Sequence, residues 1–163
     1  MKIVDDFLPV KELNELHVAL KANTFPWFMG NPTTYNLVED RYNIHFSHVF
    51  YTNFSVNSEY INLLEPLLQR LCPLALIRVK ANITTNTAEI IETGFHVDID
   101  SDKCKTAVFY VNSNDGYTAF ADGQKVQSVA NRMVIFDTQT QHTGTTTTDK
   151  PYRLVINFNY IPV

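Results

Sequence analysis

Two stretches in the first 74 residues repeat apolar side chains at the spacing of an α-helix. The first lies in residues 4–23, and Pro9 stands near its expected start, where the missing N–H costs a helix little. The second lies in residues 57–73, where Pro66 is expected to kink or restart the helix. The stripe of the first helix consists of Val10, Leu13, Leu16 and Leu20.

From residue 75 onward the pattern changes to the alternation that is typical of β-strands. Polar and apolar residues alternate in "ALIRVKANI" (75–83), and β-rich runs follow in "KTAVFYVN" (105–112) and "NRMVIFD" (131–137). Turn signals such as "NSNDG" (112–116) separate them. We expect seven or eight short strands. Because the helices are segregated from the strands, the pattern predicts a mainly β fold, a sandwich or barrel with helices packed outside.

Between the two helical stretches, the sequence predicts a loop and then a strand. Residues 25–36 hold two prolines and a glycine, so we expect an irregular loop whose Trp27 and Phe28 either form a lid or substrate platform or cap the core. Residues 41–50 alternate like a strand, which places His45 and His48 on opposite faces. A buried tautomer and a surface residue explain this pair better than metal ligands do.

Composition narrows the class of protein. A chain of 163 residues suits one domain, with residues 1–74 as a helical support region and residues 75–163 as a β core. The net charge of −4 and scattered basic residues argue against nucleic-acid and membrane-surface partners. The start of the chain resembles no signal peptide, and two cysteines outside any CxxC favour free thiols in the cytoplasm. Oligomeric state leaves no signature in the sequence.

The segment "GFHVDID" (94–100) places polar side chains at every second position. If it is a strand, His96 and Asp98 share one face, while Phe95, Val97 and Ile99 share a face suited to a core. Asp100 lies on the polar face too, where it either orients His96 or is exposed to solvent.

A third ligand comes from the C-terminal segment "QHTGTTTTDKPYRLVINFNY" (141–160). Read as a hairpin with residues 146–149 as its loop, it places His142 opposite Arg153 on one face. Alternation then points Val155, Asn157 and Asn159 inward with Arg153. The outward residues, which we expect to meet the helices, are Leu154, Ile156, Phe158 and Tyr160.

Two imidazoles and one carboxylate form a ligand set that suits non-haem Fe(II) and leaves positions open for a chelating co-substrate and O₂. Two alternatives stay open on the residues alone. One is a non-catalytic β-helix module that binds a ligand in its cavity. The other is a hydrolase that holds Zn²⁺ with the same three residues.

The order of these residues resembles the 2-oxoglutarate- and Fe(II)-dependent dioxygenases, most closely their prolyl-4-hydroxylase-like branch. The HxD motif is followed 44 residues later by His142 and 11 residues after that by Arg153. The segments "TAVFYVNSNDGYTAF" (106–120) and "NRMVIFDTQTQH" (131–142) look like the corresponding family strands. The resemblance covers about residues 75–160. It implies a double-stranded β-helix, jelly-roll or cupin-like, with the N-terminal helices packed on one sheet.

The resemblance also implies the chemistry. His96, Asp98 and His142 would bind Fe(II), and Arg153 would pair with the distal carboxylate of 2-oxoglutarate. Hydroxylation of an unactivated C–H bond with O₂ would release succinate and CO₂. The substrate implied first is a prolyl or other amino-acid residue, followed by a free small molecule. Residues 25–36, 84–93 and 112–124 are the segments expected to recognise it.

Other cavity residues follow from the resemblance or from strand alternation. Tyr110 occupies the position of a family tyrosine that lies against the co-substrate, and Asn82 shares a strand face with Lys80 and Arg78 that could line the same pocket. The branch usually has lysine where this chain has arginine. Lys150 should fall in the hairpin loop, so Arg153 is favoured for that role.

Overall fold

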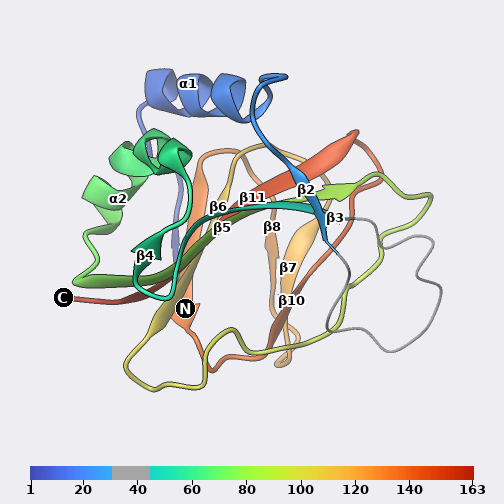
Figure 1. The fold of residues 1–163 in the computed structure, drawn as a ribbon. Coiled ribbons are helices and arrows are strands. Elements are labelled where there is room, and N and C mark those ends of the chain that lie inside the picture. The colour runs from blue at the N-terminus through green and yellow to red at the C-terminus, as the bar shows by residue number, and fades with distance from the viewer. Residues whose placement is uncertain (31–44) are drawn as a thin grey trace.

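The computed structural model describes residues 1–30 and 45–163, and most of these residues form two antiparallel sheets (Figure 1). The large sheet has the strand order β1-β9-β6-β11-β5-β3-β2, with β4 paired to β3. The small sheet has the order β10-β7-β8. The strands are β1 (Lys2–Val4), β2 (Phe28–Gly30), β3 (His45–Thr52), β4 (Ser55–Val56), β5 (Ala75–Thr85), β6 (Lys105–Tyr110), β7 (Tyr117–Phe120), β8 (Lys125–Gln127), β9 (Arg132–Asp137), β10 (His142–Gly144) and β11 (Tyr152–Ile161).

From β6 in the large sheet the chain passes to β7 and β8 in the small sheet, returns to the large sheet at β9, crosses again to β10 and ends in the large sheet at β11, which is the path of a jelly roll. A buried apolar cluster joins the inner faces, with Val108 and Val155 from the large sheet and Phe120 and Val126 from the small one. The predicted double-stranded β-helix is confirmed. The large sheet has more strands than the small one.

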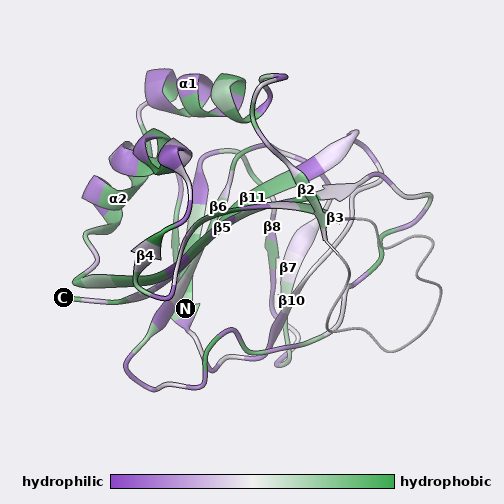
Figure 2. Cartoon of the chain, viewed as in Figure 1, coloured by the Kyte–Doolittle hydropathy of each residue, from purple (hydrophilic) through white to green (hydrophobic). Residues whose placement is uncertain are grey.

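The helices cover the outer face of the large sheet. They are α1 (Val10–Leu20), the 3-10 helix η2 (Glu59–Leu64) and α2 (Glu65–Leu71), and α1 and α2 lie on the same side in Figure 1. Leu16, Leu20 and Leu67 pack in one buried cluster with Ile156 and Phe158 of β11. Figure 2 shows hydrophobic and hydrophilic residues alternating along each helix, as expected for elements with one buried face.

Both predicted helices are present. Pro9 precedes α1, although Val10 at the start of the predicted stripe is exposed. The second helical stretch restarts just before Pro66, because η2 ends at Leu64 and α2 begins at Glu65. A helix tolerates proline in its first turn, because the N–H groups there have no acceptor within the helix and the missing N–H of proline costs no hydrogen bond.

The first 74 residues also contribute strands to the large sheet. β1 pairs with β9 and β3 pairs with β5, so the N-terminal region is part of the sheet as well as its cover. β3 begins at His45 within the predicted strand, whose residues 41–44 lie outside the described residues. In the predicted loop, residues 28–30 form β2 beside β3, and residues 31–36 lie outside the described residues.

The predicted hairpin between β10 and β11 is wrong. His142 lies opposite Phe120 of β7, whereas Arg153 lies opposite Thr84 of β5. The chain crosses from the small sheet to the large one between β10 and β11, so these two strands are not hydrogen-bonded neighbours. The alternation along β11 is nevertheless as predicted, since Leu154, Ile156, Phe158 and Tyr160 all join the cluster beneath the helices.

The strand predicted for residues 94–100 is also wrong. This segment makes one isolated bridge, between His96 and His142, and belongs to no named strand. Phe95 and Val97 are 48% and 42% exposed, so the apolar face expected to enter the core faces outward instead. Among the described residues, no packed layer buries Phe95 or Val97.

Two remaining expectations concern helices and thiols. None of the helices in the described residues has the length and apolar character that crossing a bilayer requires. Cys72 is exposed and Cys104 is buried, and both thiols are free.

Candidate metal centre

His96, Asp98 and His142 converge between β10 and the inner face of the large sheet. Their ligand atoms all lie within 4.8 Å of one another. His96 Nε2 is 3.9 Å from one carboxylate oxygen of Asp98, and His142 Nε2 is 3.7 Å from the other. The structure therefore brings together the three residues that the sequence singles out.

The backbone holds the two histidines side by side. The N–H of each donates to the carbonyl oxygen of the other, with both N–O distances at 3.0 Å. Their ring centroids are 4.7 Å apart. This pair of hydrogen bonds is the antiparallel bridge that anchors the HxD segment to the edge of the small sheet.

Each imidazole turns its Nε2 toward the carboxylate. The Nδ1 of His142 lies 2.9 Å from the carbonyl oxygen of Thr140, and the Nδ1 of His96 lies 3.2 Å from that of Gly94. Because a carbonyl only accepts, these bonds place the proton on Nδ1 and leave the Nε2 lone pair available for a metal. Burial lowers the pKa of His142 despite the opposing charge of Asp98, so its imidazole is neutral near pH 7.

Asp98 is held by three donors. Arg78 donates to Oδ1 at 2.7 Å, and the Thr106 hydroxyl and the Asn159 amide each donate to Oδ2 at 3.0 Å. Burial alone would raise the pKa of Asp98, but the charge that His142 carries when it is protonated in acid, the charge of Arg78 and the bond from Asn159 outweigh it and lower the pKa. The carboxylate is therefore ionised and fixed in orientation.

This donor set fits a divalent metal. It offers two imidazole nitrogens and one carboxylate oxygen, and it contains no thiolate. Such a set suits Fe(II) in sites that keep open coordination positions, and it does not suit metals that prefer soft sulfur ligands.

A cavity of about 300 Å³ extends from these residues along the inner face of the large sheet. Three of its walls are β5, β11 and the HxD segment. The lining residues are Arg78, Lys80, Asn82 and Thr84 from β5, Arg153, Val155 and Asn157 from β11, His96, Val97 and Asp98 from the HxD segment, and His45, Thr93 and Gly144.

Arg153 lines the same cavity although its side chain is almost completely buried. Nε donates to the Ser128 hydroxyl at 2.8 Å, one terminal nitrogen donates to Thr118 at 3.2 Å, and the guanidinium lies 5.6 Å from the Tyr110 ring centroid. Among the described residues, no carboxylate lies within ion-pair distance of this guanidinium. A buried cation with only neutral partners is suited to bind an anionic ligand.

Two glycines leave room around Arg153. A Cβ at Gly144 would lie 3.4 Å from a terminal nitrogen of Arg153, and a Cβ at Gly116 would lie 2.8 Å from its Cδ and 2.5 Å from the carbonyl oxygen of Thr146. A side chain at Gly116 would therefore displace the arginine or the backbone beside it.

The other predicted cavity residues divide into two groups. Asn82, Lys80 and Arg78 line the cavity, as their shared strand face predicts. Tyr110 is fully buried behind Arg153, with its hydroxyl donating to Thr118 at 2.7 Å. Lys150 is exposed in the loop before β11 and lies 3.7 Å from Asp149.

For three residues with two possible roles, the structure favours the role that involves neither a metal nor a substrate. Asp100 accepts a bond from Gln139 and does not contact His96, so the alternative of a surface position is confirmed. His48 is buried between the carbonyl of Pro26 and the hydroxyl of Ser58, at 2.7 and 2.8 Å. Trp27 packs against the core and donates to the carbonyl of Leu20.

The sequence gives no indication of two residues near the metal centre, one that lines the cavity and one that bonds to Asp98. His45, assigned to the surface or the core, lines the cavity, and burial and the charge of Lys80 lower its pKa. Thr106, the first residue of a segment that resembles the family, donates its hydroxyl to Asp98. Thr106 on β6 lies opposite Asn159 on β11, and this pairing brings its hydroxyl to Asp98. The register of the two strands cannot be read from the sequence.

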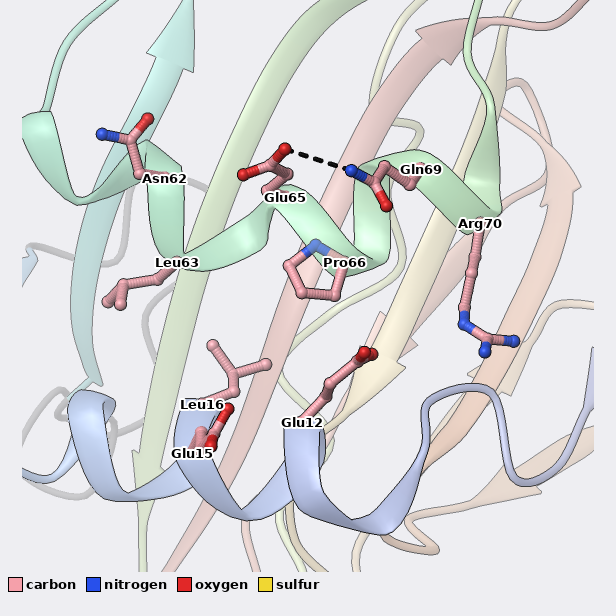
Figure 3. Close-up of a pocket in the computed structure, with 9 residues that line it drawn as sticks. All are labelled: Glu12, Glu15, Leu16, Asn62, Leu63, Glu65, Pro66, Gln69 and Arg70. Atoms are coloured by element: carbon pink, nitrogen blue, oxygen red, sulfur yellow. Dashed lines mark hydrogen bonds between the residues drawn. The ribbon is translucent and has the colours of Figure 1, made fainter.

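A larger groove of about 690 Å³ lies between α1 and the η2–α2 helices (Figure 3). Leu16, Leu63 and Pro66 line it together with Glu12, Glu15 and Glu65. It contains no predicted site residue, and its polar residues are helix surface groups such as Glu65, which accepts a bond from Gln69. Its size alone does not indicate a site.

No family model matches the sequence, and neither does any curated protein. Solved structures match nearly the whole chain. A prolyl-4-hydroxylase from Pseudomonas putida is 17% identical with a TM-score of 0.60, over 98% of this chain and 91% of that one. A 2OG-Fe(II) oxygenase family oxidoreductase from Burkholderia pseudomallei is 13% identical with a TM-score of 0.68, over 98% and 84% of the two chains. A prolyl hydroxylase from Trichoplax adhaerens, solved with a hypoxia inducible factor peptide fragment, is 14% identical with a TM-score of 0.63, over 98% and 82%.

The chain has the fold of the 2-oxoglutarate/Fe(II) oxygenases. At these identities the similarity establishes the fold alone. In this oxygenase fold the HxD segment, β10 and the start of β11 are the places where the structure puts His96, Asp98, His142 and Arg153.

Asn159 gives a test of how this oxygenase fold supports its ligands. Asn159→Ala removes one of the three donors to Asp98 and a partner of both Arg78 and Thr106, so the carboxylate is held less rigidly. Groups that orient a metal ligand typically contribute about 10- to 100-fold in metal affinity, and we expect a loss of that size. Fe(II) titration checks it, with Asn14→Ala on the exposed face of α1 as control. Unchanged affinity in Asn159→Ala would show that Asp98 needs no such support.

Proposed function

We propose that this protein is an Fe(II)- and 2-oxoglutarate-dependent dioxygenase that hydroxylates an unactivated C–H bond. The reaction would convert the substrate C–H bond, O₂ and 2-oxoglutarate into a C–OH group, succinate and CO₂. The observation that carries this proposal is one cavity lined at one place by His96 and Asp98, which cluster with His142, and at another by a buried arginine without a carboxylate partner among the described residues. That pair of features fits a metal together with a dicarboxylate.

In this proposal His96, Asp98 and His142 hold the iron through two Nε2 atoms and one carboxylate. Bound iron, with 2-oxoglutarate and O₂, would supply the oxidising chemistry that no amino-acid side chain provides. The chain's own residues bind and orient: Thr140 and Gly94 fix the imidazole tautomers, and Arg78, Thr106 and Asn159 fix the carboxylate.

Arg153 would bind the distal carboxylate of 2-oxoglutarate. A guanidinium presents a planar fork of donors that matches a carboxylate, and burial strengthens the attraction because little water competes. Asn82 lines the cavity between the two ends and is proposed to contact the co-substrate. Tyr110 acts from behind, by supporting the Arg153 guanidinium with its ring.

An amino-acid residue is the favoured substrate. Two of the similar structures are prolyl hydroxylases, and one of them was solved with a peptide fragment. A free small molecule is the second choice. The two free thiols support a reducing, cytoplasmic location.

The proposal is tested by adding Fe(II) and 2-oxoglutarate to the metal-free protein without oxygen. Chelation of iron by a 2-oxo acid is expected to give a weak visible charge-transfer band, and admitting oxygen should release succinate. The matched control replaces Fe(II) with Zn²⁺, whose filled d shell gives no such band. A protein that shows neither the band nor succinate would contradict the proposal.

The two alternatives predict different results. A ligand-binding module would bind without releasing succinate, and a zinc hydrolase would need no 2-oxoglutarate. Arg153 weighs against the hydrolase, because activation of water by zinc requires no second anion-binding group deep in the cavity.

A further inference from the structure

Cationic side chains outnumber carboxylates along the walls of the metal-site cavity. Arg78, Lys80 and Arg153 line it, whereas Asp98 is the one carboxylate among the described residues that line it. An excess of buried positive charge is costly unless an anion compensates it. The arrangement therefore favours the binding of anions in this cavity.

Two of the three cations already have a role. Arg78 pairs with Asp98 at 2.7 Å. Arg153 donates to two hydroxyls at the far end of the cavity, where the proposed function assigns it to 2-oxoglutarate. Lys80 is different: among the described residues it has neither a hydrogen-bond nor an ion-pair partner.

Lys80 is also partly withdrawn from solvent. It lies in the middle of β5, directly opposite Asn157 on β11 and Val49 on β3. Burial, reinforced by the charge of Arg78 and only partly offset by the charge of Asp98, lowers its pKa. A lysine in a central strand that only decorated the surface would extend into water.

The residue opposite Lys80 has an unused polar atom. Asn157 lines the cavity, and its buried Oδ1 has no hydrogen-bond partner in the described structure. Directly opposed side chains on neighbouring strands are about 5 Å apart at Cβ. The Lys80 ammonium group and the Asn157 amide oxygen, both without a partner among the described residues, therefore belong to adjacent residues that line the cavity.

The cavity also keeps a net positive charge when a metal and 2-oxoglutarate are bound. A divalent metal and the dianion of 2-oxoglutarate cancel each other, and Asp98 cancels one of the three side-chain cations. Two positive charges are then left in the cavity. Because the interior screens charge poorly, this excess favours a negatively charged molecule as the second ligand.

We propose that the prime substrate carries a carboxylate, which Lys80 binds, next to an amide N–H that donates to Asn157. This inference rests on the proposed function and narrows its substrate class. An amino-acid residue with a free C-terminal carboxylate has this chemistry, and so does an aspartyl or glutamyl residue. Lys80 is then a specificity-determining residue, and it takes no part in holding the metal or 2-oxoglutarate.

The test uses the protein loaded with Mn(II) and 2-oxoglutarate, so that binding is measured without turnover. Three series of probes are titrated by calorimetry: N-acetyl amino acids, the corresponding N-acetyl amino-acid amides, and the N-acetyl amides of aspartate and glutamate. The first and third series separate a terminal from a side-chain carboxylate. At least one acidic series is expected to bind about tenfold or more tightly than the neutral amides, with an affinity that falls as salt is added. Equal affinity for acids and amides, or no binding by any series, would overturn the proposal.

Lys80→Met is expected to remove the preference for acids, because methionine keeps the apolar length and loses the charge. Lys11→Met on the outer surface of α1 is the matched control and should keep the preference. The 2-oxoglutarate affinity of both variants is measured in parallel. If Lys80→Met weakens 2-oxoglutarate as strongly as Arg153→Met does, Lys80 belongs to the co-substrate and the proposal is wrong. Failure of the proposed function would show differently, as wild-type protein that binds no 2-oxoglutarate.

Discussion

His142→Ala is expected to weaken Fe(II) binding by at least about 100-fold and to abolish the visible band that forms with 2-oxoglutarate. Groups that merely orient a metal ligand contribute about 10- to 100-fold, so loss of a ligand itself should reach or exceed the upper end. His142 contributes a neutral Nε2, and its replacement leaves one imidazole and one carboxylate. Metal titration and the anaerobic spectrum measure the effect.

The control for this variant is His17→Ala. His17 is also partly buried, but it lies on α1 and its Nε2 contacts the Tyr152 hydroxyl outside the cavity. Circular dichroism of both metal-free proteins separates a lost ligand from a lost fold. Iron affinity that stays near the wild-type value in a folded His142→Ala protein would remove this residue from the metal site.

Arg153→Met is expected to raise the 2-oxoglutarate concentration needed for half-saturation by at least about 30-fold. Removing one partner of a buried, hydrogen-bonded charge pair costs about 2–5 kcal/mol, and about 1.4 kcal/mol corresponds to a factor of ten. The Ser128 and Thr118 hydroxyls that remain are neutral and cannot replace the charge. The measurement is the saturation of the anaerobic band or of succinate release.

A pair of ligands shows whether the loss concerns the distal carboxylate. 2-Oxopentanoate has the carbon chain of 2-oxoglutarate with a methyl group in place of that carboxylate. Wild type should strongly prefer 2-oxoglutarate, and Arg153→Met should bind both weakly and about equally. Arg132→Met, which removes a surface arginine paired with Asp5, should behave like wild type. A wild-type protein that did not discriminate between the two acids would exclude Arg153 as the anchor.

The alternation along β11 was predictable because it does not depend on which strand lies beside it. Every second residue of a strand faces the same side whatever its partner. Arg153, Val155 and Asn157 therefore line the cavity as expected, even though the hairpin from which this was derived does not exist. The same independence made the helix restart at Pro66 predictable, since it follows from the chemistry of proline alone.

Strand partners could not be predicted in the same way. His142 pairs with Phe120, and that contact depends on how two sheets assemble from distant segments. The HxD segment shows the second limit. Its alternation looks like a strand, but a strand requires a neighbour, and the described residues offer it only the bridge to His142. Sequence patterns report which side chains share a face and not whether another chain segment covers them.

The hydrogen-bond network around Asp98 is the part of the site that could least be predicted from the sequence. Arg78, Thr106 and Asn159 come from three different strands and meet through the register of β5, β11 and β6. Nothing in their local sequence marks them as partners of a carboxylate. The metal-ligand set could be proposed from residue types and order, whereas the groups that support it required the structure.

The bridge between His96 and His142 has a consequence for how such a protein can diversify. Because the spacing of the two imidazoles is set by a pair of main-chain bonds, it does not depend on the length of the neighbouring connections at residues 88–90 and 101–104. Insertions or deletions there can change the surface beside the candidate metal centre while His96 and His142 keep their register. The surroundings of this histidine pair can thus vary in evolution without changing the distance between the two rings.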